Sequence, residues 1–385
     1  MSIRYKLGEI CEIVSGSTPK TGIPEYWDGD IKWITPAEIS DDSYIIEDSV
    51  RHITELGVQK TGLTPFPKGT VILSSRAPIG KVAIAGCEMY CNQGFKNLIC
   101  SEAIDNRYLY WFLKGNTKYL NSIGRGATFK EISKQIVSGI EINVPDMEIQ
   151  NDAVEVLEKV SGIIRHRKLE LKALNDLSKA RFVEMFGTVK DNPYGFPTAT
   201  LKEVCYKITD GKHGGCEKEA DSGYYYVGAR EIYDGVIHYD AAPQITYADY
   251  AKDYRRCNIE QGDLVIVSTG ATIGKTAIAT SPLTEKTLLQ KSVALIKVKS
   301  DVISAKFLQY CYMTNLSMYM VENASAQPNL LLSKMNATVI YLPPLDLQEQ
   351  FSAFVAQAEK SKVAVQKALD ETQLLFDSLM QQYFG

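Results

Sequence analysis

The sequence predicts an α+β protein in which two α/β domains are each followed by a long coiled-coil-like helix, arranged as an internal pseudo-two-fold repeat. Three observations predict this fold. The second half of the 385-residue chain repeats the first, each copy begins with short β-branched runs punctuated by Gly, Pro, Asn and Asp, and each copy ends in about forty residues with heptad periodicity. Hydrophobic residues make up 45% and charged residues 23%, which is ordinary globular usage and excludes a disordered or collagen-like chain.

Three pairs of segments carry the repeat. Lys6–Cys11 matches Thr200–Cys205, Ser75–Ile84 matches Thr269–Ile278, and Phe186–Gly187 matches Phe384–Gly385. The period is far too long for a solenoid of stacked single motifs, so the chain is two copies of one unit.

The first part of each copy, residues 1–145 and 193–345, is predicted to be an α/β domain. Expected strands are Val71–Leu73, Val82–Ile84, Leu264–Val267 and Val293–Ile296, and expected helices are Tyr108–Leu113 and Phe307–Met313. The loops at 15–65 and 209–258, which occupy corresponding places in the two copies, show little sequence similarity to each other. A repeated scaffold with divergent loops can hold two copies of one partner while it contacts two different ligands.

The second part of each copy, residues 146–187 and 346–385, is predicted to be a long helix. A helix of this length extends about 60 Å. Apolar residues at heptad spacing form a seam, which is typical either of a buried bundle helix or of a coiled coil, and its recurrence favours pairing of the two helices with each other. The seam residues are Leu157, Val160, Ile164, Leu171, Leu174, Val355, Val365, Leu369, Phe376 and Leu379.

The motifs resemble those of the specificity (S) subunit of Type I restriction-modification systems. The first copy carries Ser15–Pro19, Pro24–Gly29 and Ile31–Pro36, similar to the family's G-T-P, P-E-Y-W-x-G and I-P-W-I-T-P run. The second copy carries Thr209–His213 and Ser222–Val227, similar to the alternative D-G-x-H and G-I-P-F-L loop. Further matches are the Ile-Gly-Lys element of both copies and a turn like G-S-A-Q-P-N at Ala324–Asn329.

The resemblance implies two target-recognition domains, at 1–145 and 193–345, separated by two antiparallel spacer helices. It also implies a non-catalytic subunit that recognises a bipartite, asymmetric sequence in double-stranded DNA with an unspecified gap. Two methyltransferase (M) subunits and restriction/translocase (R) subunits would be its partners. S-adenosylmethionine, ATP and Mg would be bound by those partners and not by this chain.

Base-reading residues are expected on loops, where Arg, Lys, Asn, Gln, Ser and Thr match the donors and acceptors of base edges. The candidates in the first domain are Ser17, Thr18, Lys20, Arg76, Arg125 and Lys130, and those in the second are Lys212, His213, Arg230, Thr269, Gln327 and Asn329. Trp27 and Trp33 could stack on bases, although burial in a strand is the better expectation.

The charge distribution predicts weak DNA binding by the chain alone. The net charge is −4, and once both long helices are set aside, the remaining residues carry equal numbers of basic and acidic side chains. Because phosphate neutralisation dominates affinity, the M subunits are expected to supply much of the phosphate clamp.

Other classes of site find little support. Gly270–Thr276 has three residues between its glycines where a phosphate-binding loop needs four. The eight cysteines and four histidines are too dispersed for a zinc site, and no adenine-methylation motif or nucleophile–base pair stands out. The sequence has neither an apolar run long enough to span a membrane nor a signal peptide, so a cytoplasmic protein with reduced thiols is expected.

Three alternatives remain open at this stage. The chain could be the S subunit of a methylation-only or fused system. It could be a coiled-coil assembly adaptor that binds proteins and no DNA. A nucleotide hydrolase would rest only on the defective Gly270–Thr276 loop.

Overall fold

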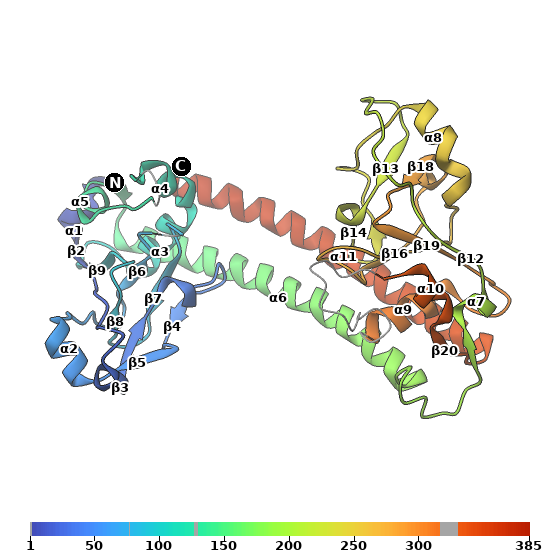
Figure 1. Ribbon diagram of the computed structural model, residues 1–385. Helices are drawn as coiled ribbons and strands as arrows, with labels where there is room; N and C mark the ends of the chain where they lie inside the picture. The colour runs from blue at the N-terminus through green and yellow to red at the C-terminus, as the bar shows by residue number, and fades with distance from the viewer. Residues whose placement is uncertain (1, 77, 127–129, 316–329) are drawn as a thin grey trace. The chain divides into compact units, whose positions relative to one another are not determined.

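The computed structural model describes residues 2–76, 78–126, 130–315 and 330–385 (Figure 1). The chain divides into two compact units, Met1–Lys168 with Lys367–Gly385 (unit 1) and Leu169–Gln366 (unit 2). Each unit therefore contains one α/β domain and part of both long helices, α6 (Met147–Phe186) and α11 (Leu345–Phe384). Both helices are continuous over 40 residues and lie within one residue of their predicted ranges.

Unit 1 is built on a five-stranded sheet with the strand order β2-β9-β6-β7-β4. Its neighbouring strands are antiparallel except for β4, which runs parallel to β7. The strands are β2 (Cys11–Val14), β4 (Ile45–Ile46), β6 (Val71–Leu73), β7 (Val82–Ala85) and β9 (Asn97–Cys100). A second sheet has the order β5-β3-β8 and consists of β3 (Trp27–Ile34), β5 (Arg51–Ile53) and β8 (Tyr90–Cys91). A separate pair is formed by β1 (Ile3–Lys6) and β10 (Glu141–Val144). The predicted strands β6 and β7 are confirmed.

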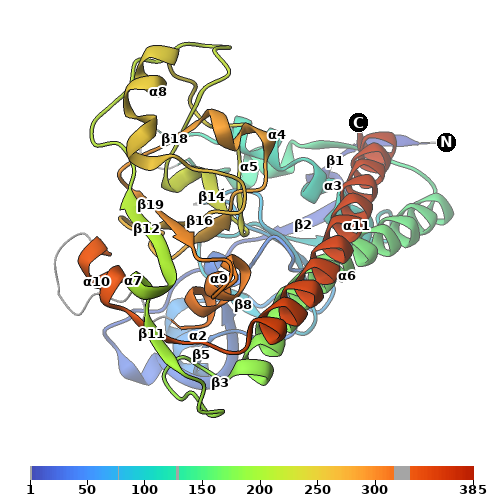
Figure 2. The same cartoon turned by 90° about the vertical axis from the view of Figure 1, so that its right-hand side faces the viewer.

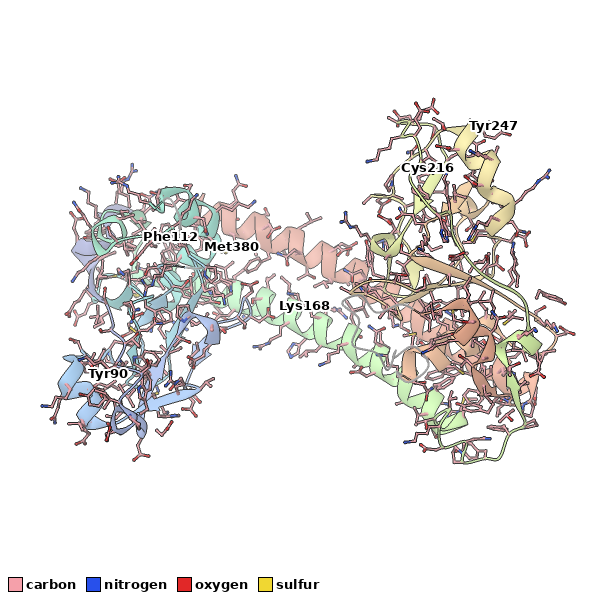
Figure 3. All side chains as sticks on the ribbon, in the orientation of Figure 1. Tyr90, Phe112, Lys168, Cys216, Tyr247 and Met380 are labelled. Carbon is pink, nitrogen blue, oxygen red and sulfur yellow. The ribbon has the colours of Figure 1, made fainter. Side chains whose placement is uncertain are left out.

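Helix α3 (Asn106–Gly115) forms the centre of the unit 1 core. It packs on β6 and β7, and six consecutive residues, Tyr108–Leu113, are buried. The Trp111 ring lies 5.6 Å from that of Phe376 on α11, and Figure 3 shows Phe112 and Met380 close together in the same region. The other helices of unit 1 are α1 (Leu7–Ile10), α2 (Glu55–Thr61), α4 (Thr117–Ile123), α5 (Lys134–Ser138) and the 3-10 turns η1 (Pro24–Tyr26) and η2 (Pro36–Glu38).

Unit 2 is built on a four-stranded antiparallel sheet with the order β12-β19-β16-β17. These strands are β12 (Cys205–Asp210), β16 (Leu264–Val267), β17 (Thr276–Ile278) and β19 (Val293–Val298). Two-stranded pairs join β11 (Thr198–Thr200) to β20 (Val339–Tyr341), β13 (Tyr225–Val227) to β18 (Thr287–Leu289), and β14 (Ile232–Tyr233) to β15 (Val236–Ile237). In both views, α8 (Tyr247–Asp253) lies at the top of unit 2 and α10 (Leu332–Ala337) lies below it (Figures 1 and 2). The remaining elements are α7 (Leu201–Val204) and the 3-10 turns η3 (Ala229–Glu231), η4 (Tyr254–Cys257) and η5 (Pro282–Lys286).

Helix α9 (Ala305–Thr314) takes the place in unit 2 that α3 takes in unit 1. It packs on β17, and its Phe307 ring lies 5.5 Å from that of Phe182 on α6. Phe182 and Phe186 of α6 in turn contact Phe351 of α11, at 5.3 and 5.6 Å between ring centroids. The guanidinium of Arg181 lies 5.9 Å from the Phe354 ring. Within unit 2, the end of α6 therefore pairs antiparallel with the start of α11.

A buried glutamine ties the first turn of each long helix to its domain. The Gln150 carboxamide accepts the N–H of Asp105 at 2.9 Å and donates to the carbonyls of Ala103 and Pro145. Gln348 in the same way accepts the N–H of Ser304 at 2.9 Å and donates to the carbonyls of Val302 and Pro343. Asp105 and Ser304 are the N-caps of α3 and α9, so the repeat extends to the polar contacts that hold the helices.

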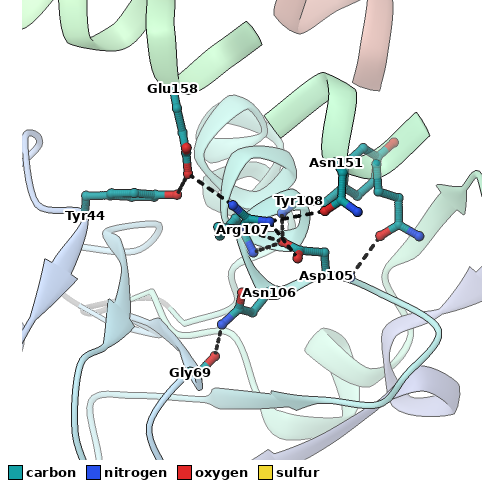
Figure 4. Close-up of polar contacts among 9 residues, drawn as sticks. Tyr44, Gly69, Asp105, Asn106, Arg107, Tyr108, Asn151 and Glu158 are labelled. Carbon is teal, nitrogen blue, oxygen red and sulfur yellow. Dashed lines mark hydrogen bonds and ion pairs between the residues drawn. The ribbon is translucent and has the colours of Figure 1, made fainter. Parts of the chain in front are cut away.

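A charged network surrounds this anchor in unit 1 (Figure 4). Arg107 contacts Asp105 at 3.2 Å, the Asn151 carboxamide at 3.2 Å and Glu158 at 4.0 Å. The Tyr44 hydroxyl donates to the Glu158 carboxylate. Burial and this carboxylate raise the pKa of Tyr44, so its hydroxyl stays protonated as a donor.

None of the ten predicted seam residues is exposed. Those that are buried are Leu157, Val160, Ile164, Val355 and Val365, and those that are half-buried are Leu171, Leu174, Leu369, Phe376 and Leu379. Part of the seam packs into the domains, because Leu157 belongs to the hydrophobic core of unit 1 together with α3 residues, and Val355 to that of unit 2 together with α9 residues. Within the part of the chain that the structure describes, no helix is both long and apolar enough to cross a membrane.

Candidate nucleic-acid interface

Three loops converge in each unit at the ends of the central strands. In unit 1 they are the loop after β2 (15–20), the β6–β7 loop (described at 74–76 and 78–81) and the β8–β9 turn (92–96), which we call loop cluster 1. In unit 2 they are the loop after β12 (211–215), the β16–β17 loop (268–275) and the β18–β19 turn (290–292), which we call loop cluster 2.

A glycine in each cluster lets the first loop lie directly against the strand before the turn. A Cβ on Gly16 would lie 1.8 Å from the carbonyl oxygen of Cys91, and a Cβ on Gly211 would lie 2.2 Å from that of Leu289. No side chain fits at either place. Both domains therefore need glycine here, although the residues around it differ.

Two buried tryptophans hold the first loop of cluster 1. The Trp33 Nε1 donates to the carbonyl of Ser17 at 3.0 Å, and the Trp27 Nε1 donates to that of Lys20 at 3.2 Å. The two rings meet edge to face at 5.1 Å and are 6% and 2% exposed for Trp27 and Trp33. The expectation that these rings are buried is confirmed, and their indole N–H groups fix the position of the loop from the protein interior.

The β6–β7 loop of cluster 1 is organised around Glu131. The Glu131 carboxylate lies 3.3 Å from the Lys96 ammonium and 4.0 Å from the Arg76 guanidinium. Its backbone exchanges two hydrogen bonds with Arg125. Ser75 links this loop to the β8–β9 turn, because its N–H donates to the Gly94 carbonyl at 2.7 Å. The structure thus brings the predicted Arg76 and Arg125 together at one residue, Glu131, Arg76 through the carboxylate and Arg125 through the backbone.

In cluster 2, the predicted Lys212 is held by two aspartates. Its ammonium lies 2.7 Å from Asp253 and 3.4 Å from Asp249, and its side chain is 12% exposed. The hydrogen bond to Asp253 outweighs burial and raises the pKa of Lys212. The backbone N–H of Lys212 donates to the Leu289 carbonyl, and its own carbonyl accepts the N–H of Lys291 at 2.9 Å. Lys212 therefore secures the loop to the β18–β19 turn.

Asp210 gathers two further basic groups beside this loop. Its carboxylate lies 2.6 Å from the His213 Nε2 and 2.7 Å from the Arg256 guanidinium. Burial raises the pKa of Asp210, but the hydrogen bonds from Arg256 and His213 outweigh burial and hold the pKa below its ordinary value. Within cluster 2, Lys212 and His213 are therefore engaged by carboxylates of the same domain.

A cavity of about 430 Å³ opens in cluster 2. It is lined by Lys212, Gly214, Tyr226, Thr269, Gln290, Lys291 and Ser292. The Ser268 N–H donates to the Ser292 carbonyl at 2.8 Å, so the β16–β17 loop that carries Thr269 is joined to the turn as in cluster 1. The remaining candidate, Arg230, is exposed on η3.

The two clusters share the same strand pairing and the same 3-10 turn, although the sequences of their loops differ. Ile34 pairs with Cys91 in parallel, as Val227 pairs with Leu289. After each of these strands a 3-10 turn is closed by a glutamate: Glu38 accepts the N–H of Thr35, and Glu231 accepts that of Gly228. Segments 32–38 and 225–231 are therefore equivalent.

The predicted DNA-contacting residues fall into three groups. Ser17, Thr18, Lys20, Arg76, Lys212, His213 and Thr269 lie in the clusters; Arg125, Lys130 and Arg230 lie on neighbouring segments; and Gln327 and Asn329 lie outside the described residues. Sequence reasoning missed the β8–β9 and β18–β19 turns, which carry Gln93 and Lys291. The available signal was a polar triplet before a strand in each copy, Asn92–Gly94 and Gln290–Ser292.

Across the described ranges, no group of three or more His, Cys, Asp or Glu side chains is placed to hold a metal ion. What the clusters offer are hydroxyl, carboxamide, ammonium and guanidinium groups on short, well-braced loops, the chemistry of base-edge and phosphate recognition.

The family described as Type I restriction modification DNA specificity domain matches residues 4–173 and 193–372, which is most of both copies. The chain belongs to this family. The Type I restriction enzyme MjaIX specificity subunit of Methanocaldococcus jannaschii is 29% identical, over 97% of this chain and 90% of that protein. The Type I restriction enzyme HindI specificity subunit of Haemophilus influenzae is 25% identical over 42% of this chain.

Solved structures agree with the fold of a specificity subunit. The S subunit of the Type I restriction-modification system from M. genitalium matches with a TM-score of 0.60 at 15% identity, over 100% of this chain and 96% of that one. A chain from a structural study of Type I R-M complex assembly and conformational transition matches with a TM-score of 0.61 at 19% identity. At these identities the likeness concerns the fold: two domains that combine helices and strands, joined by long helices, in an internal repeat.

Proposed function

We propose that this specificity subunit reads a bipartite, asymmetric DNA target with an unspecified gap, and that each loop cluster reads one half. The observation that carries the proposal is the combination of one loop framework, built twice, with different side chains. Gly16 and Gly211 and the glutamates of η2 and η3 are equivalent, whereas Thr18 and Arg76 have His213 and Gly270 as their counterparts in the repeat. Equal scaffolds with unequal tips suit two different half-sites.

In this proposal the chain is not a catalyst but the recognition and assembly subunit of an adenine methyltransferase and endonuclease complex. Two M subunits and the R subunits dock on the repeated scaffold and bring S-adenosylmethionine, ATP and Mg. The electrostatics support a division of labour. Lys212, Lys96 and Arg256 are paired with carboxylates and are not free to neutralise phosphates, so M subunits are expected to supply much of the phosphate clamp.

The test is a methylome of a host that carries the cognate M subunits, with and without this chain. A gapped two-part motif that depends on the chain supports the proposal. Complex formation with no enriched motif contradicts it and favours an adaptor that binds only proteins. Presence or absence of restriction in the same host separates a full system from a methylation-only one.

The division of labour has its own measurement. Binding of the chain to its target is measured over a range of salt concentrations, alone and with M subunits. We expect weaker binding and a shallower salt dependence for the chain alone, because fewer phosphates are neutralised. Equal affinity of the free and M-bound chain would contradict this part.

A further inference from the structure

The β8–β9 turn of unit 1 and the β18–β19 turn of unit 2 occupy the same position in the repeat. Each turn follows the strand residue that ends the parallel pairing, Cys91 in one domain and Leu289 in the other. Each precedes an equivalent antiparallel strand, since Val71 pairs with Leu98 as Leu264 pairs with Ile296. These registers make Gln93 and Lys291 equivalent: both are two residues after the parallel strand.

Both turns are braced on two sides. The carbonyl after the tip, of Gly94 or Ser292, accepts an N–H from the β6–β7 or β16–β17 loop, at 2.7 and 2.8 Å. From the other side, the loop that follows Gly16 or Gly211 reaches the tip residue itself: the Thr18 hydroxyl donates to the Gln93 Oε1 at 2.5 Å, and the Lys212 carbonyl accepts the Lys291 N–H at 2.9 Å. Such support gives a reading group a fixed position before DNA arrives.

The two tip side chains are exposed and keep functional groups available. The hydroxyl of Thr18 uses one lone pair of the Gln93 carboxamide oxygen, which leaves the second lone pair and both N–H donors. Two lysines line the cavity of cluster 2, and Lys212 is engaged by Asp249 and Asp253. Over the described residues, the ammonium of Lys291 has no hydrogen-bond acceptor or carboxylate partner.

We propose that Gln93 and Lys291 are equivalent specificity-determining residues, each reading one base of its own half-site. A carboxamide with a free donor and acceptor matches the N6 and N7 edge of adenine, and an ammonium matches the O6 and N7 edge of guanine. Unit 1 thus reads an adenine through Gln93, and unit 2 reads a guanine through Lys291. This inference rests on the proposed function, because it assigns bases within the half-sites.

The test replaces Lys291 by Met, which keeps the length of the side chain and removes its charge. Cognate M subunits are expressed with the wild-type or variant chain, and the methylated motif is sequenced. At one guanine of one half-site, we expect discrimination to fall on the order of 10- to 100-fold, while the other half-site and the gap stay unchanged. Lys202→Met, an exposed lysine of α7 outside the cluster, is the matched control and should leave the motif intact.

A second set of variants tests whether the preferred base can be changed and not only lost. Lys291→Gln should shift the preferred base at that position from guanine toward adenine, and Gln93→Lys should make the reverse shift in the other half-site. Co-purification with M subunits shows that each variant is folded.

The outcomes separate this inference from the proposed function. An unchanged motif in Lys291→Met and Lys291→Gln overturns the inference and leaves the function standing. So does an equal loss of binding on all sequences, which identifies a phosphate contact. A wild-type chain that directs no two-part motif overturns both.

Discussion

Removal of the Gln348 carboxamide is expected to loosen unit 2 and leave unit 1 intact. The side chain is fully buried and serves one N–H and two carbonyls. Gln348→Ala leaves the Ser304 N–H at the start of α9 without an acceptor. A buried polar group that loses its partner costs about 1–3 kcal/mol, and the shortened side chain also leaves a small void. The free energy of unfolding of unit 2 should therefore fall by about 3 kcal/mol.

The assay must resolve the two units, because a chain with two cores does not unfold in a single two-state step. Amide hydrogen exchange of the native chain does so. A loss of about 3 kcal/mol corresponds to exchange about 100-fold faster in the slow amides of α9. The α3 amides of unit 1 should be unaffected.

The repeat and an exposed glutamine provide controls. Gln150→Ala should produce the converse result, because Gln150 makes the same three hydrogen bonds in unit 1. Exchange should become faster in α3, and the exchange rates of the α9 amides should not change. Gln357→Ala, on the exposed face of α11, should change neither helix. If exchange in α9 rose less than threefold in Gln348→Ala, or rose equally in both helices, the anchoring role would be refuted.

Three other predictions follow from the packing, the ion pairs and the helices. Phe351→Ala should destabilise unit 2 by about 3–5 kcal/mol, because the ring is fully buried among α6 and α9 aromatics, with unfolding followed by hydrogen exchange. Because the pKa of Asp210 is lowered in the folded chain, its carboxylate contributes its full stabilisation of unit 2 above the ordinary value of 3.8, and this contribution is lost as the pH falls through the lowered pKa. In an acid titration followed by circular dichroism, Asp210→Asn should not show that loss of stability. One heptad inserted after Lys168 and one after Gln366 should lengthen the unspecified gap of the methylated motif, and a change in either half-site would contradict the spacer role of the helices.

The regular elements were predictable because local pattern dictates them. β-Branched runs became β6, β7, β16 and β19, apolar periodicity became α3 and α9, and proline-free heptads became the two 40-residue helices. The repeat was visible because strand and helix positions tolerate only similar residues.

The loop clusters were only partly predictable, because tertiary contacts decide them. Lys212 was expected as a base-reading residue, and nothing in the sequence indicated that Asp249, which lies 37 residues away, engages it together with Asp253. Lys96 and Glu131 likewise meet across 35 residues. The equivalence of Gln93 and Lys291 follows from strand register and not from their chemistry, which differs, so comparison of the two copies by residue type could not find it.

The chain segments that build each core determine when that core can be completed during synthesis. Unit 2 ends at residue 366, but unit 1 takes residues 367–385 into its core, where Phe376 covers Trp111 and Phe384 covers Tyr108. Although most of unit 1 precedes unit 2 in the chain, its core is therefore completed only after unit 2 has been made. Until residues 367–385 have been made, Trp111 and Tyr108 lack these two aromatic neighbours, and exposed apolar surface of this kind promotes aggregation.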